Sequence, residues 1–395
     1  MKIKVLFVLI FFYLMGSQLV SSQSTAVNLP IIDISKNHPK KEIIIQEIAD
    51  IEYVALETTD DILLSERAVL SYISDKYILV YEPVLGDIFV FNRNGKICSQ
   101  FNHKGQSGKE YSWIRAGVIF DEKNEEIYVC SQSIQVYKIN GEFKRTLKKN
   151  AIQNELKVYN FDNETLLIYE GVNIDPAYEV FAKKNGLNFS PTAKPYSLIS
   201  KKDGSTVFAF DIFLPIRYSN KFAQVLENNT WRPIEIFFPN SIYYGEDFMI
   251  ADISCDTMFL LTKEKILTPI LVRKPSVHTS EPRRVWTTLL TTDRFIVMGI
   301  IPLDINSKSG KIPFFLYEFK TGEFSILSIF DSEYGMKEWG PSTSPVIAKN
   351  MTAELRQTHI LLEAYKKKQL KGKFEKFVET LDEDDNPIVR IMTFK

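Results

Sequence analysis

The chain has 395 residues, enough for one large β domain or two ordinary domains. Hydrophobic residues make up 45% of it and aromatic residues 13%, which supplies a sizeable core and excludes a disordered chain. The 48 lysines and arginines nearly balance the 49 acidic residues, and a net charge of −1 excludes a general attraction to nucleic acid or to anionic membranes.

The N-terminus has the layout of a secretory signal peptide. Lys2 and Lys4 precede an apolar run, Val5–Met15, and small and polar residues follow it. This run is short for a membrane-spanning helix, so we expect residues 1–22 to be removed; an uncleaved anchor is the alternative. No later segment is long enough to span a membrane, and the first cysteine is Cys98, which leaves no lipid-anchor cysteine near the cleavage point. We therefore expect an exported protein, periplasmic or extracellular.

The chain contains three cysteines, Cys98, Cys130 and Cys255. An odd number spread this widely over a large exported domain does not form a disulfide framework. Each cysteine lies in or beside an apolar strand pattern, so we expect all three to be reduced and mostly buried.

A lead-in segment, residues 23–50, precedes a long region of short β-rich runs bounded by turn residues. Five hairpins recur in this region, and glycine is favoured in their turns because such turns require positive φ. The spacings between successive turns are 46, 63, 60 and 58 residues. A unit of about four strands at this length is typical of a β-propeller blade. The turn positions used for the spacings are Gly95, Gly141, Gly204, Glu264 and Gly322.

The two ends of the β region supply a sixth blade. An alternating strand, Ile51–Glu57, precedes the first hairpin unit, and a second strand, Ile388–Phe394, ends the chain. A propeller must close its ring to remove open sheet edges, so we expect these two strands to pair. The predicted fold is therefore all-β, a six-bladed propeller of four-stranded blades over residues 51–395.

One region departs from the strand pattern. Residues 352–381 place apolar side chains three, four and seven positions apart among many lysines and glutamates, which predicts an amphipathic helix broken near Gly372. We expect a helical insertion in the last blade, packed on the rim of the propeller.

Four segments resemble the six-bladed β-propeller proteins that are common in Bacteroidetes and related to NHL-repeat propellers. They are IEYVALETTDDILL (51–64), FNRNGKICSQFNHKGQSGKEY (91–111), CDTMFLL (255–261) and DNPIVRIMTFK (385–395). The family is largely uncharacterised, so the resemblance implies a fold and a compartment but almost no chemistry.

The loop Gly105–Gly108 does not predict a phosphate site, because it lacks a Gly-Lys-Ser/Thr ending and no helix follows it. We interpret it as a connection between blades that leads to one mouth of the channel. Aromatic rings beside charged groups are typical of a recognition site. The candidate ligand-binding residues are Lys104, Glu110, Tyr111, Trp113 and Arg115. The alternative is structural: the two aromatic rings pack between blades one and two, and the carboxylate pairs with the arginine.

No catalytic or metal-binding motif is evident, so we expect no cofactor. The four histidines are isolated, and the acidic run Asp382–Asn386 lacks the spacing of a calcium loop, although calcium binding there stays open. Two functions remain. The first is a monomeric, non-catalytic module of the cell envelope that binds a glycan, a peptide or an envelope protein. The second is a hydrolase or lyase acting on an extracellular glycan or ester.

Overall fold

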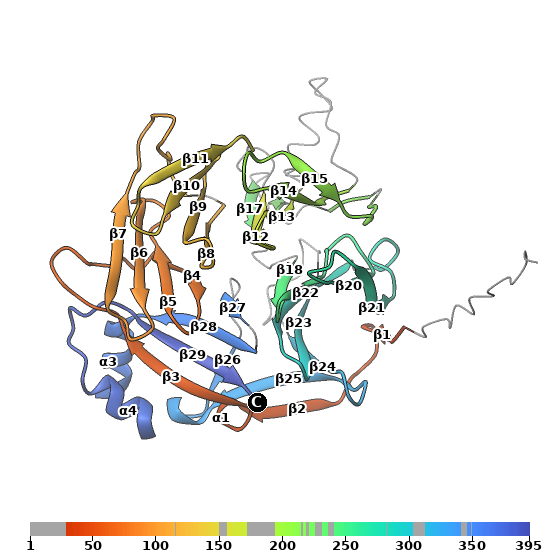
Figure 1. Ribbon diagram of the computed structural model, residues 1–395. Coiled ribbons are helices and arrows are strands. Elements are labelled where there is room, and N and C mark those ends of the chain that lie inside the picture. The colour runs from red at the N-terminus through yellow and green to blue at the C-terminus, as the bar shows by residue number, and fades with distance from the viewer. Residues whose placement is uncertain are drawn as a thin grey trace, which may run out of the picture.

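The computed structural model describes residues 29–114, 116–149, 156–171, 194–214, 216–218, 221–225, 231–235, 241–281, 283–302, 313–340, 346–348 and 350–395. These residues form six sheets arranged in a ring, each built on four antiparallel strands (Figure 1). This is the predicted all-β, six-bladed propeller. The predicted signal peptide, residues 1–22, lies outside the described residues.

In blades 1 to 5 the four strands follow one another in chain order from the channel to the rim, and in blade 6 the outer strand is β3, from the N-terminal part of the chain. Blades 1 to 3 contain β4 (Val69–Ile73), β5 (Tyr77–Tyr81), β6 (Asp87–Asn92), β7 (Ile97–Asn102); β8 (Val118–Asp121), β9 (Glu126–Cys130), β10 (Ile134–Lys138), β11 (Phe143–Leu147); and β12 (Lys157–Asn160), β13 (Thr165–Tyr169), β14 (Tyr196–Ser200), β15 (Thr206–Ala209). Blades 4 to 6 contain β18 (Ser241–Tyr244), β19 (Asp247–Ile250), β20 (Thr257–Leu261), β21 (Leu267–Lys274); β22 (Arg284–Thr291), β23 (Phe295–Pro302), β24 (Phe314–Glu318), β25 (Phe324–Asp331); and β27 (Val346–Ala348), β28 (Met351–Arg356), β29 (Ile388–Phe394), β3 (Ala49–Ala55).

Burial follows the position of a strand within its blade. Both faces of a middle strand pack against neighbouring blades, so β9 is buried at all five positions. Outer strands are buried less, and in β7 exposed side chains alternate with two partly buried ones and the buried Phe101. This explains the cysteines, all three of which are free: Cys130 on β9 is buried, Cys255 is partly buried, and Cys98 on β7 is exposed. The prediction of burial was therefore wrong for Cys98, because the apolar run around it is an outer strand.

The five predicted hairpins are the connections between the third and fourth strands of blades 1 to 5. Their glycines have positive φ, as expected, and Gly95 has φ +79°. A Cβ atom at Gly95 would lie 1.9 Å from the carbonyl oxygen of Ala55, so only glycine fits this turn. In blade 4 the positive φ belongs to Lys265 rather than to Glu264, the predicted turn position.

The ring closes as predicted, by pairing the two ends of the β region. Strand β3 pairs antiparallel with β29 from Ala49 opposite Phe394 to Ala55 opposite Ile388. The pairing begins two residues earlier than predicted. Glu57, the last residue of the predicted strand, instead accepts a hydrogen bond from the backbone N–H of Ile97 on blade 1, at 2.9 Å.

A buried amide fastens this closure to blade 1. The Nδ2 atom of Asn386 donates to the carbonyl oxygens of Glu57 and Ile62, each at 2.8 Å, and its Oδ1 atom accepts from the N–H of Leu64 at 2.7 Å. The N–H of Asn386 donates to the hydroxyl of Thr58 at 2.9 Å. A buried amide with this many partners fixes one geometry, because any other arrangement leaves polar groups without water or partners.

The lead-in segment contributes strands to the propeller, which the sequence analysis did not predict. Strand β1 (Ile31–Asp33) pairs in parallel with β21 at the rim of blade 4, and β2 (Lys40–Ile44) pairs in parallel with β25 at the rim of blade 5. Helix α1 (Ile45–Ile48) then leads into β3 of blade 6. The N-terminal chain therefore crosses the outer edges of three consecutive blades.

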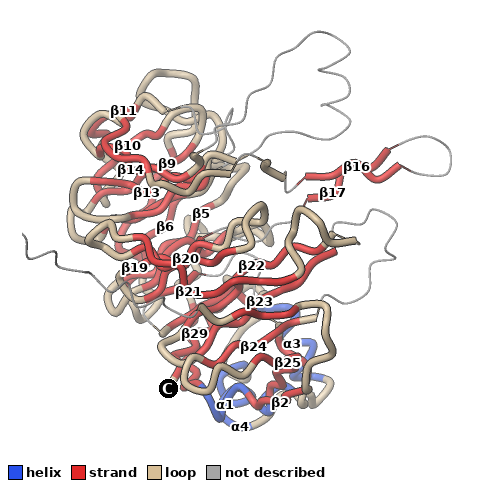
Figure 2. Tube along the Cα trace, turned by 90° about the vertical axis from the view of Figure 1, so that its right-hand side faces the viewer, coloured by secondary structure: helices blue, strands red, loops and turns tan. Residues whose placement is uncertain are grey.

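The helical insertion lies between β28 and β29 and comprises α3 (Thr358–Lys366) and α4 (Gly372–Val378). It packs on the rim, as predicted: the ring of Phe374 stacks on Tyr53 of β3 at 4.3 Å between centroids. The predicted start at residue 352 was too early, because residues 351–356 alternate as strand β28 before the helical spacing begins. Smaller elements are the 3-10 turn η1 (Ser332–Tyr334), β26 (Lys337–Trp339), and the hairpin of β16 (Lys221–Val225) and β17 (Trp231–Glu235), which projects away from the ring in Figure 2.

Candidate functional site

The ring has two faces, which the strand order defines. Chain enters β8 from the connection after blade 1 and leaves it through residues 122–125, so these two segments lie at opposite ends of β8. The same alternation holds in every blade. One face carries the turns that join the first strand of a blade to the second and the third strand to the fourth. We call it the turn face. The opposite face, with the connections between second and third strands and between blades, is the loop face.

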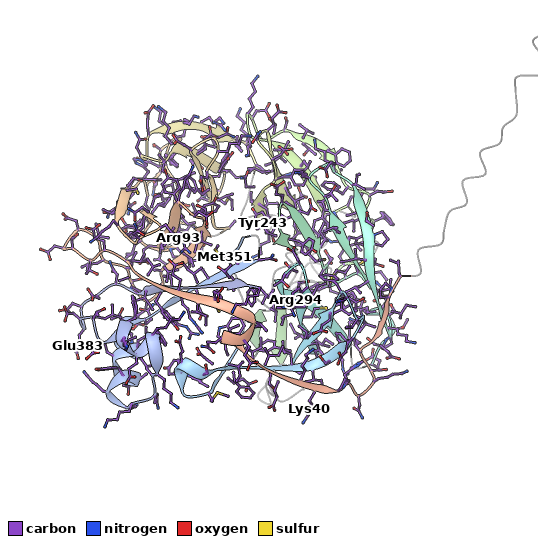
Figure 3. The ribbon with its side chains drawn as sticks, turned by 60° about the horizontal axis from the view of Figure 1, so that its bottom comes forward. Lys40, Arg93, Tyr243, Arg294, Met351 and Glu383 are labelled. Carbon is purple, nitrogen blue, oxygen red and sulfur yellow. The ribbon has the colours of Figure 1, made fainter. Side chains whose placement is uncertain are left out.

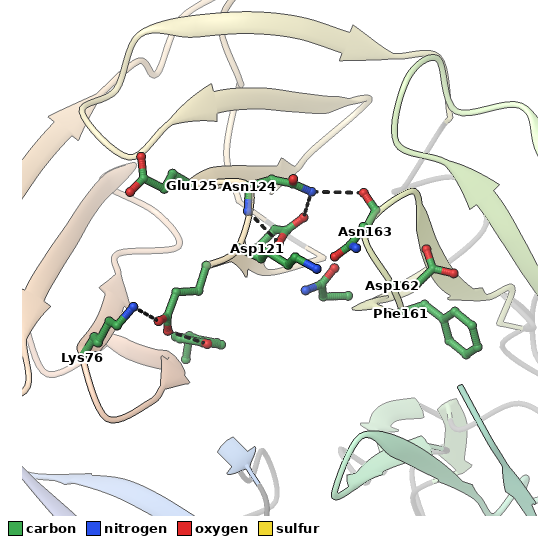
Figure 4. Close-up of a pocket in the computed structure, with 11 residues that line it drawn as sticks. Lys76, Asp121, Asn124, Glu125, Phe161, Asp162 and Asn163 are labelled. Carbon is green, nitrogen blue, oxygen red and sulfur yellow. Dashed lines mark hydrogen bonds and ion pairs between the residues drawn. The ribbon is translucent and has the colours of Figure 1, made fainter. Parts of the chain in front are cut away.

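An open pocket of about 850 Å³ lies on the turn face (Figure 4). It is formed where the first strands of blades 1, 2 and 3 turn into the second strands. Its volume is in the range of small-ligand sites, but its lining is largely polar. The lining residues are Tyr72, Lys76, Asp121, Glu122, Lys123, Asn124, Glu125, Asn160, Phe161, Asp162 and Asn163.

Short polar side chains fix the backbone of the turns that form the pocket. Asp121 accepts from the N–H of Asn124 at 3.2 Å, and its other oxygen accepts from the Asn124 side chain at 2.7 Å. Asp162 accepts from the N–H groups of Glu164 and Thr165 at 2.8 and 2.7 Å. Aspartate favours such turns because its carboxylate can bond the backbone two or three residues further on.

Asp121 and Asn160, which line the floor of the pocket, are bonded to a buried ammonium group behind them. Lys201, in the last turn of blade 3, donates to Asp121 Oδ2 at 2.5 Å, to Asn160 Oδ1 at 2.6 Å and to the carbonyl oxygen of Asp162 at 2.5 Å. The side chains of Lys201 and Asp121 are 5% and 3% exposed. All three N–H bonds of the ammonium are used, so this lysine joins blades 2 and 3 and leaves the Asp121 carboxylate neutralised.

Tyr72 lines the pocket, and Tyr243 bonds the backbone of another lining residue. The hydroxyl of Tyr72 donates to Glu122 at 3.0 Å, and Lys76 lies 3.6 Å from the other oxygen of that carboxylate. Burial, and then the charge of Glu122, raise the pKa of Tyr72 well above its ordinary value. The hydroxyl of Tyr243 accepts from the N–H of Asn160 at 3.0 Å. Figure 3 places Tyr243 near the middle of the ring.

The outer margin of the pocket differs from its floor. The side chains of Lys123, Glu125 and Asn163 make no hydrogen bond or ion pair with any described residue, and all three are exposed. They are held in place through their backbones; for example, the carbonyl oxygen of Asn163 accepts from Asn124 at 3.0 Å. An ammonium, a carboxylate and an amide on fixed turns can donate to and accept from a polar ligand.

The sequence-predicted site lies on the loop face, away from this pocket. Lys104 donates to the carbonyl oxygen of Val84 at 2.7 Å, and Glu110 accepts from the N–H of Ser107 at 2.8 Å. That backbone hydrogen bond lowers the pKa of Glu110. Trp113 is 44% exposed, and Arg115 lies outside the described residues, so its predicted pairing is not described.

Tyr111 is the exception within that set, because it is buried between blades 1 and 2. Its hydroxyl donates to the carbonyl oxygen of Gly86 at 2.7 Å and accepts from the N–H of His103 at 3.0 Å. Its ring meets Tyr137 edge to face. The structure thus brings Lys104, Glu110 and Trp113 to one exposed loop and places Tyr111 in the core beneath it.

The glycine turns do not indicate the pocket, because none of them lines it. A second repeated signal is present in the sequence: short polar runs follow or end three of the first strands, DEKN (121–124), DNET (162–165) and TDR (292–294). Thr292, like the aspartates, accepts from the backbone two residues on, at 3.2 Å. Reading these runs as turns at equivalent blade positions would have placed them on one face.

Within the described part of the chain, no group of three or more histidine, cysteine, aspartate or glutamate side chains is arranged to hold a metal ion. The acidic run Asp382–Asn386, where calcium binding was left as a possibility, makes hydrogen bonds within the protein. The N–H of Asp382 donates to the carboxylate of Asp385 at 2.8 Å, and Lys366 bonds Glu383 at 2.6 Å. None of the described helices is long and apolar enough to cross a membrane.

Comparisons with known proteins agree with the fold and the family. Residues 29–393 match the family described as Domain of unknown function (DUF4934). A solved structure described as an exported protein of Bacteroides fragilis is 11% identical, with a TM-score of 0.60 over 92% of this chain and 99% of that one. A member of the DUF4221 family from Bacteroides vulgatus is 8% identical, with a TM-score of 0.48 over 89% and 99%. No curated protein matches this chain.

Proposed function

Because the chain belongs to the DUF4934 family, whose description assigns no activity, we propose a function from the site itself: an exported, non-catalytic propeller that binds a small polar ligand in the turn-face pocket. The main support is a contrast within the pocket. The side chains of its floor are hydrogen-bonded to Lys201, whereas the polar side chains of its margin have no partners among the described residues. A fixed turn backbone at the mouth of a cavity favours binding, because less backbone freedom is lost when the ligand arrives.

The state of the pocket carboxylates supports binding over catalysis. A general acid or base must be able to exchange a proton with its substrate. Asp121 is neutralised by Lys201, Glu122 bonds Tyr72, and one oxygen of Asp162 is used by three donors of its own turn. Among the lining carboxylates, Glu125 alone makes no hydrogen bond or ion pair with a described residue, and it lies on the exposed margin, so a hydrolase or lyase would have to rely on this one exposed carboxylate.

Export is supported by two independent features. The N-terminal residues have the order of a signal peptide. The structurally similar Bacteroides fragilis protein is described as exported. An envelope location gives access to glycans and peptides, and amide and carboxylate groups suit the hydroxyl groups of a sugar.

The experiment is a binding screen with neutral and acidic oligosaccharides and dipeptides, read by ligand-observed NMR. We expect a binder whose signal is lost in the double variant Lys123→Ala/Asn163→Ala, since both side chains are exposed and their removal leaves the fold intact. The matched control is Trp113→Ala on the loop face, which should bind like the wild type. If Trp113→Ala loses binding and the pocket variant keeps it, the site predicted from sequence is correct and the pocket proposal is wrong.

A further inference from the structure

The outer edges of the six blades are not covered equally. Strands β1 and β2 cover blades 4 and 5, and on blade 6 the ammonium of Lys373 in α4 bonds the carbonyl oxygen of Ile51 at 2.6 Å. Blades 1 and 2 end in β7 and β11, which expose polar or charged side chains such as Asn102 and Lys144. Covering an edge or charging it prevents association with other strands.

Blade 3 has neither protection among the described residues. All four residues of β15, Thr206–Ala209, are exposed, and Val207 is 52% exposed. The chain continues as an extended segment in which Phe210 and Ile212 are buried, whereas Phe213 is 60% exposed. Four exposed large apolar side chains therefore fall within ten residues of chain: Val207, Phe208, Phe213 and Ile216. Exposed apolar surface that is concentrated in this way marks an interaction site or an aggregation hazard.

The backbone of this edge is oriented for pairing. The N–H of Phe210 donates inward to the carbonyl oxygen of Tyr196 at 3.0 Å. Because N–H and C=O groups alternate sides along a strand, those of Ala209 and Asp211 point away from the blade. The edge is also balanced in charge, since Lys194 and Asp211 pair on it at 2.7 Å while both side chains remain largely exposed.

We propose that the edge of blade 3 binds a second copy of this chain, with residues 206–212 pairing antiparallel with the same residues of the other copy about a two-fold axis near Ala209. A two-fold contact needs only one surface, and it must be self-complementary. This edge meets that requirement: the outward N–H and C=O groups of Ala209 can bond their own equivalents, and Phe208, whose ring packs against Phe210 in one copy, lies opposite Phe210 of the other. Blade 5 gives a precedent within the chain, because β26 pairs antiparallel with its outer strand.

Sedimentation velocity of the mature protein over a range of micromolar concentrations tests this inference. We expect a dimer in the wild type and a monomer in the double variant Val207→Glu/Phe213→Glu, because position 207 lies opposite Asp211 of the other copy and like charges repel there. The matched control is Leu63→Glu/Ile266→Glu, which adds the same charge at two exposed apolar positions of other blades and should remain dimeric. A wild type that stays monomeric, or a dimer that the Val207→Glu/Phe213→Glu variant leaves intact, overturns the proposal.

A cross-link tests the pairing independently of how the glutamate variant folds. In an antiparallel pair with mutual hydrogen bonds the opposed Cα atoms lie about 5.5 Å apart, within the range of a disulfide. The variant Cys98→Ser/Ala209→Cys should therefore form a disulfide-linked dimer under mild oxidation. The wild type, with its exposed Cys98 on the edge of blade 1, is the control and should stay unlinked. Absence of the cross-link in the Cys98→Ser/Ala209→Cys variant overturns the two-fold pairing.

Discussion

The turn face and the loop face of this propeller are built differently. Every connection on the turn face between strands of one blade has two to five residues, whereas three connections on the loop face have 26, 31 and 31. Short turns leave little conformational freedom and hold the polar margin of the pocket in place. Long connections can vary without disturbing the ring, which is the usual way in which a scaffold acquires different functions. The turn face is therefore rigid and holds a formed pocket, whereas the loop face can vary.

We expect the largest loss of stability from removing the strand that closes the ring. Deleting Ile388–Lys395 removes β29, which leaves one edge of β3 and one edge of β28 unpaired. Open edges of this length associate with other chains, so we expect aggregation and loss of the cooperative thermal transition. Size-exclusion chromatography and calorimetry provide the measurement. A truncated protein that keeps the oligomeric state and the melting temperature of the full-length chain would show that β29 does not close the ring.

The next largest loss of stability should come from the loop face, where Asn386 bonds the closing blade to blade 1. Replacing Asn386 with alanine leaves the carbonyl oxygens of Glu57 and Ile62 and the N–H of Leu64 without their partner. Each buried group that loses its partner costs about 1–3 kcal/mol, so we expect a loss of about 3 kcal/mol in the free energy of unfolding, measured in urea. Asp384→Ala, an exposed residue of the same acidic run, is the matched control and should change stability by less than about 0.5 kcal/mol. Equal effects of the two substitutions would contradict the role given to Asn386.

On the turn face, acid should weaken the contact between the second and fourth strands of blade 2. Burial alone would raise the pKa of Glu126, but hydrogen bonds from Arg145, Lys144 and Tyr128 hold it at about 2. A depressed pKa means that the stabilisation is present above the unfolded value and is lost as the pH falls through the folded one. We expect about 2 kcal/mol to be lost between roughly pH 4.5 and pH 2.

The control for this pH dependence is Glu126→Gln. The amide cannot titrate, so the variant should be less stable at neutral pH and should lose less stability than the wild type over the same acid range. Chemical denaturation at several pH values measures both curves. Parallel curves for the two proteins would mean that Glu126 does not couple the fold to pH.

Much of the ring could be predicted from the sequence, because its signals are local. An Asn-Gly pair such as Asn94-Gly95 requires positive φ, and the same turn recurs at the same place in successive blades. Closure followed from the need to remove open edges, and only the strands at the two ends of the β region were left to pair.

The remainder could not be predicted because it depends on distant partners. Ile31–Asp33 is a strand only because β21, more than two hundred residues later, offers it a parallel edge. Cys98 has apolar neighbours like those of Cys130, and only its place in an outer strand exposes it. The pocket floor joins Lys201 to Asp121, 80 positions apart, and no spacing in the sequence indicates that contact.

Hydrogen–deuterium exchange of the protein, with and without the tightest binder of the oligosaccharide and dipeptide screen, tests whether the ligand binds in the turn-face pocket. We expect slower amide exchange in residues 121–126 and 160–165, which form turns around the pocket, and unchanged exchange in residues 103–114 of the loop face. Protection confined to residues 103–114, with the two turns unaffected, would contradict this expectation and place binding on the loop face.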